Sequence, residues 1–384
     1  MTTPLPREHF PVADRYRYLN HARVAAPPTV VAHALARDAS AATMLGSTSQ
    51  LARTQRAEAV RRTCADLLGT SADDLTFVRN TTEGMALVAN GLHWAPGDEV
   101  VVVDREHPLT VTPFAALADR GVRLRTVAPD DRTAAVPIER FAEALRAGQG
   151  RARLLVVAWV HHARGWRHDL AALAEVAHAH GALLVVDAIQ GAGVVPLELA
   201  AWGVDAAAVG AQKWLLGPEG IGLLHTTPEL RSTLRVQQTG YGSLALGDDG
   251  RYVLDLVADL SGRRFEGGTS AVGATGGLGA SSELLAGAGI DAIWAHVDRW
   301  CDALVGGLGE LGADVLSDRS PDGRSSIVSA RFDRVDADAL VDQLVAHGIV
   351  VSAWDGAVRF SPHGWNDEEE LDAALRALRR ASRR

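Results

Sequence analysis

The stretch Val209-Gly-Ala-Gln-Lys213-Trp-Leu-Leu-Gly-Pro-Glu-Gly-Ile-Gly222 contains Lys213, the only lysine in a chain that has 38 lysine and arginine residues together. A GC-rich genome favours arginine codons, and arginine replaces lysine well as a surface cation. Its guanidinium stays protonated, however, whereas a lysine ε-amine can lose its proton and form a Schiff base. Lys213 is therefore the first candidate for a reactive residue, and the alternative is an ordinary surface lysine.

Length and composition predict a globular protein of two domains. The chain has 384 residues, 47% of them hydrophobic, and a net charge of −9. A chain of this length is expected to form a large domain and a smaller one. The negative charge, without a long basic run, argues against nucleic acid as a partner. The N-terminus lacks an apolar signal core, and no uninterrupted apolar stretch has membrane-spanning length, which predicts a cytoplasmic protein without membrane contact.

The two cysteines argue against a disulfide framework and against a metal site. Cys64 and Cys301 lie far apart in the sequence, and neither belongs to a Cys-x-x-Cys pair. Zinc sites and disulfide-rich folds use closely spaced cysteines, so we expect a reducing compartment and no bound metal.

Apolar segments alternate with helical patterns between residues 30 and 187. Strands are predicted at 74–78, 99–103, 122–127, 154–160 and 182–187, and helices at 30–68, from Asn80 onward and at 170–180. This alternation is typical of a mostly parallel sheet covered by helices on both faces. Ligands of such sheets bind beyond the carboxyl ends of the strands. Because Asn80, His107, His161 and Asp187 follow predicted strands, we expect them to line one cleft.

The two ends of the chain differ from this pattern. Residues 1–28 contain five prolines and are predicted to form an extended arm. An Ala- and Gly-rich helix is predicted from beyond Thr269 to about Leu311, and strands and helices then alternate to residue 380, as in a small α+β domain. The predicted division is an N-terminal arm at 1–19, a large domain at 20–265, and a linking helix with a small C-terminal domain at 266–384.

Polar groups at three places suit a phosphorylated pyridine cofactor. Asp187 ends a strand 26 residues before Lys213, and a carboxylate there can keep a pyridine nitrogen protonated, although it can equally be a cap or a metal ligand. The segment Asn80-Thr-Thr-Glu-Gly84 forms either a phosphate site or an ordinary helix cap, with the threonines at the cap position. The ring of His107 either stacks on a flat cofactor or has a structural role.

Six motifs together resemble those of a known family. They are Thr81-Thr-Glu-Gly84, Glu106-His107, Val186-Asp-Ala-Ile-Gln-Gly-Ala-Gly193, Lys213-Trp-Leu-Leu-Gly-Pro-Glu-Gly-Ile-Gly222, Arg264-Phe-Glu-Gly-Gly-Thr269 and Val358-Arg-Phe-Ser-Pro362. In this order they resemble the class V aminotransferase family, which includes cysteine desulfurases, isopenicillin N epimerase-like enzymes and C–S lyases. These are fold type I enzymes that use pyridoxal 5′-phosphate, and the resemblance runs from about Leu19 to the C-terminus.

The resemblance implies a fold and a role for individual residues. The fold is α/β, with a mostly parallel seven-stranded sheet in the large domain and a small α+β C-terminal domain. Lys213 would hold the cofactor as a Schiff base, and Arg359 would bind the substrate α-carboxylate unless it forms only a surface salt bridge. The other implied cofactor contacts are Asp187 to the pyridine nitrogen, Gln190 to the phenolic oxygen, His107 stacked on the ring, and Thr81 and Thr82 on the phosphate. Thr269 would reach the phosphate held by the partner subunit, since members of the family are homodimers with composite active sites.

The chain departs from the family pattern at several positions near the cofactor. Gln212 stands where the family has histidine before the lysine, and Gly210 stands where a serine is frequent. His162 replaces an Asn or Tyr, on a loop that also carries His161 and Trp166, so a different substrate pocket is expected. Arg23 replaces a small residue and contacts either the substrate or only solvent.

The reaction predicted from these features is a β-elimination. The segment Val351–Gly356 has no cysteine, so an enzyme persulfide is not expected. Lys213 would remove the Cα proton of an amino-acid substrate, and a cysteine-derived, natural-product-like substrate would then lose its thiol. Lys213, Asp187, His107 and His162 are the catalytic candidates, with His161, Trp166, Arg23 and Arg359 on the substrate side.

An aminotransferase or an epimerase of the same family is the alternative. A non-catalytic cofactor-binding protein is disfavoured because Lys213, Asp187 and Arg359 are all present, and a dehydrogenase because a Gly-x-Gly-x-x-Gly motif is missing after the first strand.

Overall fold

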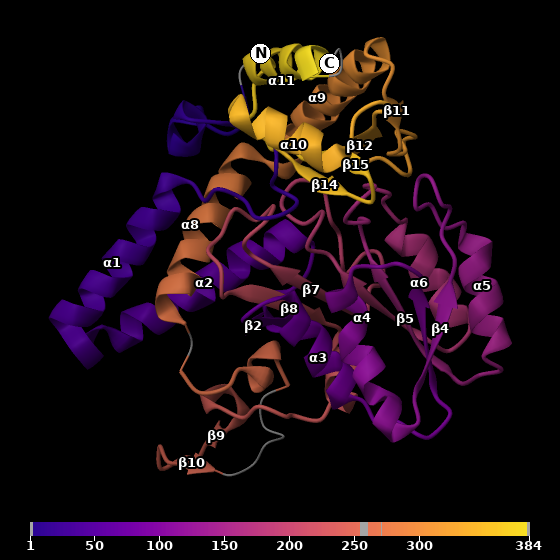
Figure 1. Cartoon of the computed structure of the whole chain (residues 1–384). Helices are drawn as coiled ribbons and strands as arrows, with labels where there is room; N and C mark the ends of the chain where they lie inside the picture. Colours follow the sequence, from indigo (N-terminus) through magenta and orange to yellow (C-terminus); the bar gives the residue numbers. More distant parts are fainter. Residues whose placement is uncertain (1–2, 254–259, 270, 382–384) are drawn as a thin grey trace.

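The computed structural model describes residues 3–253, 260–269 and 271–381. A seven-stranded sheet forms the centre of the larger part, in the order β2-β8-β7-β6-β5-β3-β4 (Figure 1). Its strands are β2 (Leu75–Val78), β3 (Glu99–Val103), β4 (Arg123–Val127), β5 (Ala152–Ala158), β6 (Leu183–Asp187), β7 (Ala206–Gly210) and β8 (Gly222–Thr226). Only β8 runs against its neighbours, pairing antiparallel with β2 and β7. The predicted mostly parallel α/β fold is therefore confirmed.

Helices cover both faces of this sheet because the strand residues alternate between two apolar cores. Val100 and Val102 of β3 face a core with α3 (Thr81–Gly91) and α4 (Pro108–Ala115). Val101 and Val103 face a second core, which includes side chains of α2 (Gln50–Leu68), α5 (Ile138–Ala147) and α6 (Leu170–Ala179). Both faces are dry, which is why the parallel strands are continuous hydrophobic runs.

Two predicted long helices are each divided in the structure. The helical pattern at 30–68 forms α1 (Thr29–Leu45) and α2, separated by a 3₁₀ turn at Gly46–Ser49. The helix expected from beyond Thr269 to Leu311 is α8 (Val272–Ala288) followed by α9 (Ile290–Glu310), and Gly289 between them has φ of +80°. Glycine adopts this left-handed conformation without steric cost, so each break occurs at a glycine.

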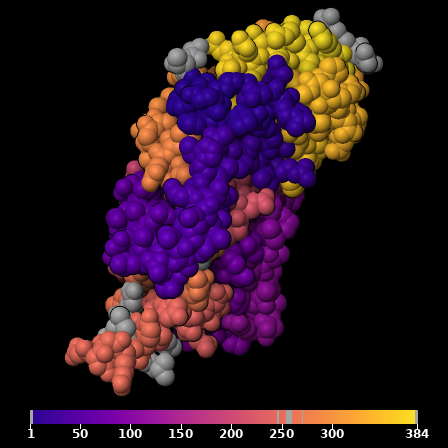
Figure 2. Space-filling model, turned by 90° about the vertical axis from the view of Figure 1, so that its left-hand side faces the viewer, coloured from indigo at the N-terminus to yellow at the C-terminus, as the bar shows by residue number. Residues whose placement is uncertain are grey.

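The C-terminal part forms a second, smaller sheet. Antiparallel strands β11 (Asp314–Val315), β12 (Val328–Arg331), β15 (Ala357–Phe360) and β14 (Ser352–Trp354) lie in this order, with α9 and α10 (Ala337–Ala346) packed against them. Helix α11 (Glu368–Ala381) packs on α9 and α10. The N-terminal arm joins this part through β1 (Arg17–Tyr18), which pairs parallel with β13 (Ile349–Val350). Figure 2 shows the indigo arm lying between the large sheet domain and the yellow C-terminal part. The exact domain limits near residues 19 and 265 stay a prediction.

One short hairpin lies apart from the rest of the chain. After α7 (Pro228–Thr233), strands β9 (Ala245–Leu246) and β10 (Tyr252–Val253) pair antiparallel. They project beyond the large domain at the bottom of Figures 1 and 2. Among the described residues, no helix is both long and apolar enough to cross a membrane.

Candidate active site

Five loops meet beyond the carboxyl ends of the parallel strands and of β2. They follow β2, β3, β5, β6 and β7, and they surround a cavity of about 780 Å³. The cavity walls include most of the residues predicted for the cofactor, namely Thr81, Thr82, His107, Asp187, Gln190, Gln212 and Lys213, together with the catalytic candidate His162. The expected cleft at this edge of the sheet is therefore present.

Lys213 and Asp187 form the charged centre of this cavity. Asp187 ends β6 and is buried, and its Oδ2 accepts a hydrogen bond of 2.7 Å from Thr110 Oγ1 while its Oδ1 accepts one of 3.1 Å from Ile189 N. Burial raises the pKa of Asp187, against these hydrogen bonds and the charge of Lys213. Burial also lowers the pKa of Lys213 to about 8, although Asp187 acts in the opposite direction. A buried carboxylate of this kind is stabilised by any cation brought into the cavity.

The start of α3 supplies the anion-binding end of the cavity. Asn80, not a threonine, is the N-cap residue, because its side chain accepts a hydrogen bond of 2.9 Å from Glu83 N. This corrects the prediction that the threonines cap the helix. Thr81 and Thr82 instead begin the first turn, where backbone N–H groups have no partner inside the helix. Thr81 Oγ1 also accepts a hydrogen bond of 2.9 Å from Gly210 N, which ties the helix start to β7.

The departures at Gly210 and Gln212 are related to each other. A methyl group on Gly210 would lie 2.5 Å from Gln212 Oε1 and 3.2 Å from Thr81 Oγ1. A serine at this position would therefore collide with Gln212 in its present conformation. Glycine at position 210 and glutamine at position 212, the two departures from the family pattern, therefore fit together sterically.

Gln190 and His107 lie on opposite sides of this centre. Gln190 Nε2 donates to Ala22 O at 3.0 Å, and its Oε1 accepts from Trp214 Nε1 at 3.1 Å, so the N-terminal arm fixes its side chain. His107 caps α4 by accepting from Leu109 N at 3.3 Å, which leaves its ring face free of hydrogen bonds. Burial lowers the pKa of His107, and the charge of Lys213 adds to this, so the ring is neutral and suited to stacking.

Arg359 has an unsatisfied buried guanidinium. Its Nε donates to Ser352 Oγ at 3.2 Å and its Nη1 to His162 O, whereas Nη2 is buried without a hydrogen-bond partner. Burial lowers the pKa of Arg359 to about 10, and the nearby charge of Arg23 acts in the same direction. Leaving a buried charged donor unpaired is costly, and a carboxylate ligand would satisfy it.

Trp354 lies over Arg359 at the tip of the β14–β15 hairpin. The Arg359 guanidinium carbon is 5.6 Å from the centre of its ring, and the ring meets His162 edge-on with centroids 4.9 Å apart. Arg164 donates to the backbone oxygens of Trp354 and Asp355, which holds the tip in place. Trp354 was not predicted as a site residue. The sequence signal that could have indicated it is its position five residues before Arg359, across a tight turn.

Three predicted residues lie outside this cluster. Trp166 donates to His168 Nδ1 at 3.3 Å and packs against Gly323, so its ring faces the C-terminal part and not the cavity. Arg23 is exposed, although its charge is felt at Arg359. Thr269 is also exposed and lines a different cavity with residues of α2 and α8. The proposed contacts of these three residues stay predictions.

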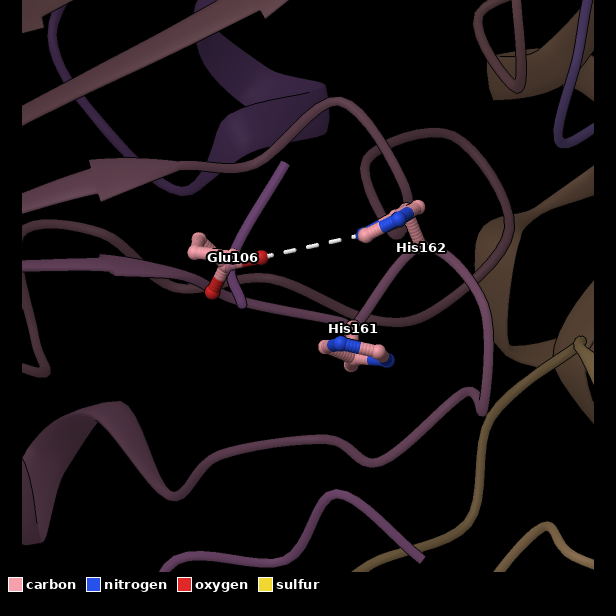
Figure 3. A group of neighbouring side chains, drawn as sticks. All are labelled: Glu106, His161 and His162. Carbon is pink, nitrogen blue, oxygen red and sulfur yellow. Dashed lines mark ion pairs between the residues drawn. The ribbon is translucent and has the colours of Figure 1, made fainter. Parts of the chain in front are cut away.

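Glu106, His161 and His162 form a buried group at the floor of the site (Figure 3). His162 comes from the loop after β5 and lines the cavity with Lys213. Glu106 comes from the loop after β3, and sequence reasoning passed over it because only His107 of the Glu-His motif carried an expected role. His161 lies directly behind, with its Nδ1 accepting from Arg164 N at 3.1 Å.

Neither cysteine reaches the cavity. Cys64 is buried in α2 with Sγ 3.3 Å from Ser282 Oγ, and Cys301 is buried in α9. Burial raises the pKa of Cys64 to about 11 and that of Cys301 to about 12. Both thiols are therefore protonated and inert at neutral pH.

Comparison with known proteins agrees with this arrangement. Residues 18–374 match the family described as aminotransferase class-V. A relative named probable cysteine desulfurase, from Methanothermobacter thermautotrophicus, is 32% identical over 301 residues, covering 77% of this chain and 73% of the relative.

Two solved structures of a protein called C-DES share the fold. One, a mutant with glycine covalently linked to its PLP cofactor, has a TM-score of 0.89 at 24% identity and covers 97% of this chain and 99% of its own. The other, described as a complex of the cystine C–S lyase with its reaction product cysteine persulfide, has a TM-score of 0.88 at 24% identity and covers 96% and 99%. The family match over nearly the whole length decides the question of membership: this chain belongs to the class-V aminotransferase family, the pyridoxal-phosphate enzymes that its motifs predicted.

Proposed function

We propose that this enzyme cleaves the Cβ–S bond of a cysteine-derived amino acid by β-elimination. The observation that carries the proposal is the combination of an unpaired Nη2 on Arg359, whose charge acts on Lys213, with a site that no cysteine enters. The first feature suits an α-amino acid, and the second removes the acceptor that a persulfide-forming mechanism would need.

The groups around the cavity fit pyridoxal phosphate. The helix start at Thr81 and Thr82 suits a phosphate dianion, Asp187 suits a pyridinium nitrogen, and Lys213 suits an aldehyde carbon. The lack of a side chain at Gly210 lets Gln212 and Thr81 approach its backbone closely, because a Cβ there would lie 2.5 Å from Gln212 Oε1. When bound, this cofactor acts as an electron sink that makes a Cα–H bond acidic.

The side chains of this protein would then perform three tasks. Arg359 Nη2 would bind the substrate carboxylate and so fix the direction of the Cα–H bond. Lys213, with a pKa lowered to about 8, has a substantial neutral fraction near neutral pH and would take the Cα proton as general base. Asp187, buried and hydrogen-bonded by Thr110, would hold a proton on the pyridine nitrogen.

One structural neighbour supports elimination over an enzyme persulfide. The cystine C–S lyase is described with a persulfide on its product, not on the protein. A relative named probable cysteine desulfurase is more similar in sequence, at 32% identity against 24% for the C–S lyase, but Cys64 and Cys301 of this chain are buried away from the cavity. A larger, natural-product-like thiol portion is part of the proposal, supported by Trp354, which is 37% exposed and meets His162 edge-on.

A homodimer with composite sites completes the proposal. Thr269 lines a second cavity of about 780 Å³, together with Arg61, Glu266 and residues of α1 and α8. Exposed apolar side chains occur near this surface, including Met44 and Leu51. A second copy seated there would cover them and bring its own Thr269 towards the neighbouring site. The cytoplasmic location stays a prediction.

Product analysis tests the reaction. S-substituted L-cysteines, from S-methyl to S-benzyl, should each yield free thiol, pyruvate and ammonia in equal amounts without a keto-acid co-substrate. Activity that requires a keto acid and releases no thiol would make the enzyme an aminotransferase. Racemisation without thiol release would make it an epimerase.

A further inference from the structure

The group formed by Glu106, His161 and His162 is arranged for proton transfer and not for metal binding. Their potential ligand atoms all lie within 4.8 Å of one another, and the three residues are buried. The His161 ring, however, is already engaged by the backbone of both Arg164 and Arg105. A metal ion bound at Nδ1 would have to displace the Arg164 N–H group.

Glu106 is held rigidly by the backbone. Its Oε1 accepts from His107 N at 2.9 Å, and its Oε2 accepts from Ala158 N at 3.2 Å. These two bonds fix the orientation of the carboxyl group, so Glu106 presents Oε1 in a fixed position to the side chain that faces it.

His162 faces this carboxylate with one nitrogen and the cavity with the other. Its Nδ1 is buried, has no hydrogen-bond partner, and lies 3.9 Å from Glu106 Oε1. Figure 3 shows the two side chains pointing towards each other across this gap. Nε2 is neither hydrogen-bonded to a described residue nor sealed off, and the ring lines the cavity, so this nitrogen opens towards the reacting groups. A shift of about 1 Å would close the gap to a hydrogen bond.

The charges around His162 make its protonation dependent on the substrate. Burial lowers the pKa of His162 to about 3, and His107, Arg359 and Lys213 add to this, while Asp355 opposes it. A substrate carboxylate on Arg359 would neutralise one of these cations. Arg359 Nη1 also donates to the backbone oxygen of His162. This hydrogen bond links the binding of a carboxylate on Arg359 to the position of His162.

We propose that His162, oriented by Glu106, donates a proton from Nε2 to the leaving sulfur atom. The inference rests on the proposed β-elimination. The Cβ–S bond breaks with its electron pair going to sulfur, the Nε2 proton forms the S–H bond, and His162 is left neutral. Solvent returns the proton, and water completes the hydrolysis to pyruvate and ammonium. His162 is the catalytic residue in this step, and Glu106 is a positioning residue.

A leaving-group comparison tests the role of His162. Chloride leaves without a proton, whereas an alkanethiolate needs one, so β-chloro-L-alanine and S-ethyl-L-cysteine separate acid catalysis from every other step. In His162→Gln, kcat/KM for S-ethyl-L-cysteine should fall by about 100-fold or more, and that for β-chloro-L-alanine by less than about 3-fold. His347→Gln, an exposed histidine of the C-terminal part, is the matched control and should change neither.

Equal losses with both substrates, or no loss with S-ethyl-L-cysteine, would overturn the assignment. Failure of the unaltered enzyme to eliminate from either substrate would refute the proposed function instead.

Nitrogen NMR of the histidine rings gives a readout apart from turnover, and it identifies the His162 signal by its loss in His162→Gln. With glycine, which has a carboxylate but no leaving group, the pKa of His162 should rise from about 3 by several units, towards neutrality, because Nε2 must carry a proton to donate it.

Glu106→Gln should remove most of this rise, because it replaces the facing negative charge with a neutral amide. The same pKa with and without glycine, or a rise that survives in Glu106→Gln, would contradict the positioning role. If His162→Gln loses its cofactor, Glu106→Gln still tests the proposal through the pKa of His162.

Discussion

Lys213 lies in an environment that favours its neutral amine. Desolvation is the main cause of its lowered pKa of about 8, and the charge of Arg359 adds to it. A group with a lowered pKa is unprotonated above that value, and only the neutral amine attacks an aldehyde. The apoprotein should therefore take up pyridoxal phosphate faster as the pH rises, with a midpoint near 8, measured by stopped-flow absorbance. A rate independent of pH between 6 and 9.5 would show that Lys213 is neutral throughout.

Most residues of the site could be predicted from sequence because the carboxyl ends of parallel strands meet at one edge. Asp187, His107 and Thr81 each follow an apolar strand, so their meeting with Lys213 was a consequence of topology. Glu106 and Trp354 could not be assigned in this way. Their importance depends on side-chain distances across 56 and 192 residues of chain, to His162, which no local pattern encodes.

At the scale of elements, helix α3 joins stability to cofactor binding. Asn80 satisfies Glu83 N, and Asn80→Ala should lower the free energy of unfolding by about 1 kcal/mol. The same change should loosen the helix start that faces the phosphate, so cofactor retention should fall as well. Denaturant titration and the rate of cofactor loss on dialysis measure the two effects.

Asp336→Ala is the matched control for this prediction. Asp336 caps α10 through Asp338 N and Ala339 N, far along the chain from the cavity. It should cost a similar free energy of unfolding and leave cofactor retention unchanged. If both variants lose cofactor equally, the helix start of α3 has no special part in holding it.

Some element boundaries depended on more than periodicity. Strand β7 is Ala206-Ala-Ala-Val-Gly210, a composition that favours helix, and it is a strand because both of its faces are buried in the sheet. It was not predicted, although the lysine motif begins within it. The divisions at Gly46 and Gly289 require left-handed backbone, whereas the glycines inside α8 and α9 do not break those two helices.

At the scale of the whole molecule, the N-terminal arm connects the two sheets. Asn20 bridges to Ser361, and Gln190 of the site donates to Ala22 of the arm. The sequence predicted an extended arm from its prolines, whereas Arg7–His9 and Pro11–Asp14 form 3₁₀ turns. The pairing of the arm with β13 is a long-range contact that depends on the assembled fold. Closure of the site therefore depends on residues from both ends of the chain.

The proposed homodimer makes a prediction about shared sites. Light scattering should give twice the 40.6 kDa of one chain. Thr269→Ala should weaken cofactor retention by roughly tenfold, the value of a hydrogen bond to a charged group. Mixed dimers of Thr269→Ala and Lys213→Ala chains should recover one intact site in each dimer. An active, cofactor-loaded monomer would refute the composite site.

The central claim is that Lys213 carries the cofactor in a site built by these loops. The most direct measurement is borohydride reduction of the purified yellow protein, followed by peptide mapping with mass spectrometry. The account predicts a single pyridoxyl group on the peptide that contains Lys213, the only lysine of the chain. A colourless protein that takes up no pyridoxal phosphate, or a pyridoxyl group on the N-terminal amine alone, would contradict it.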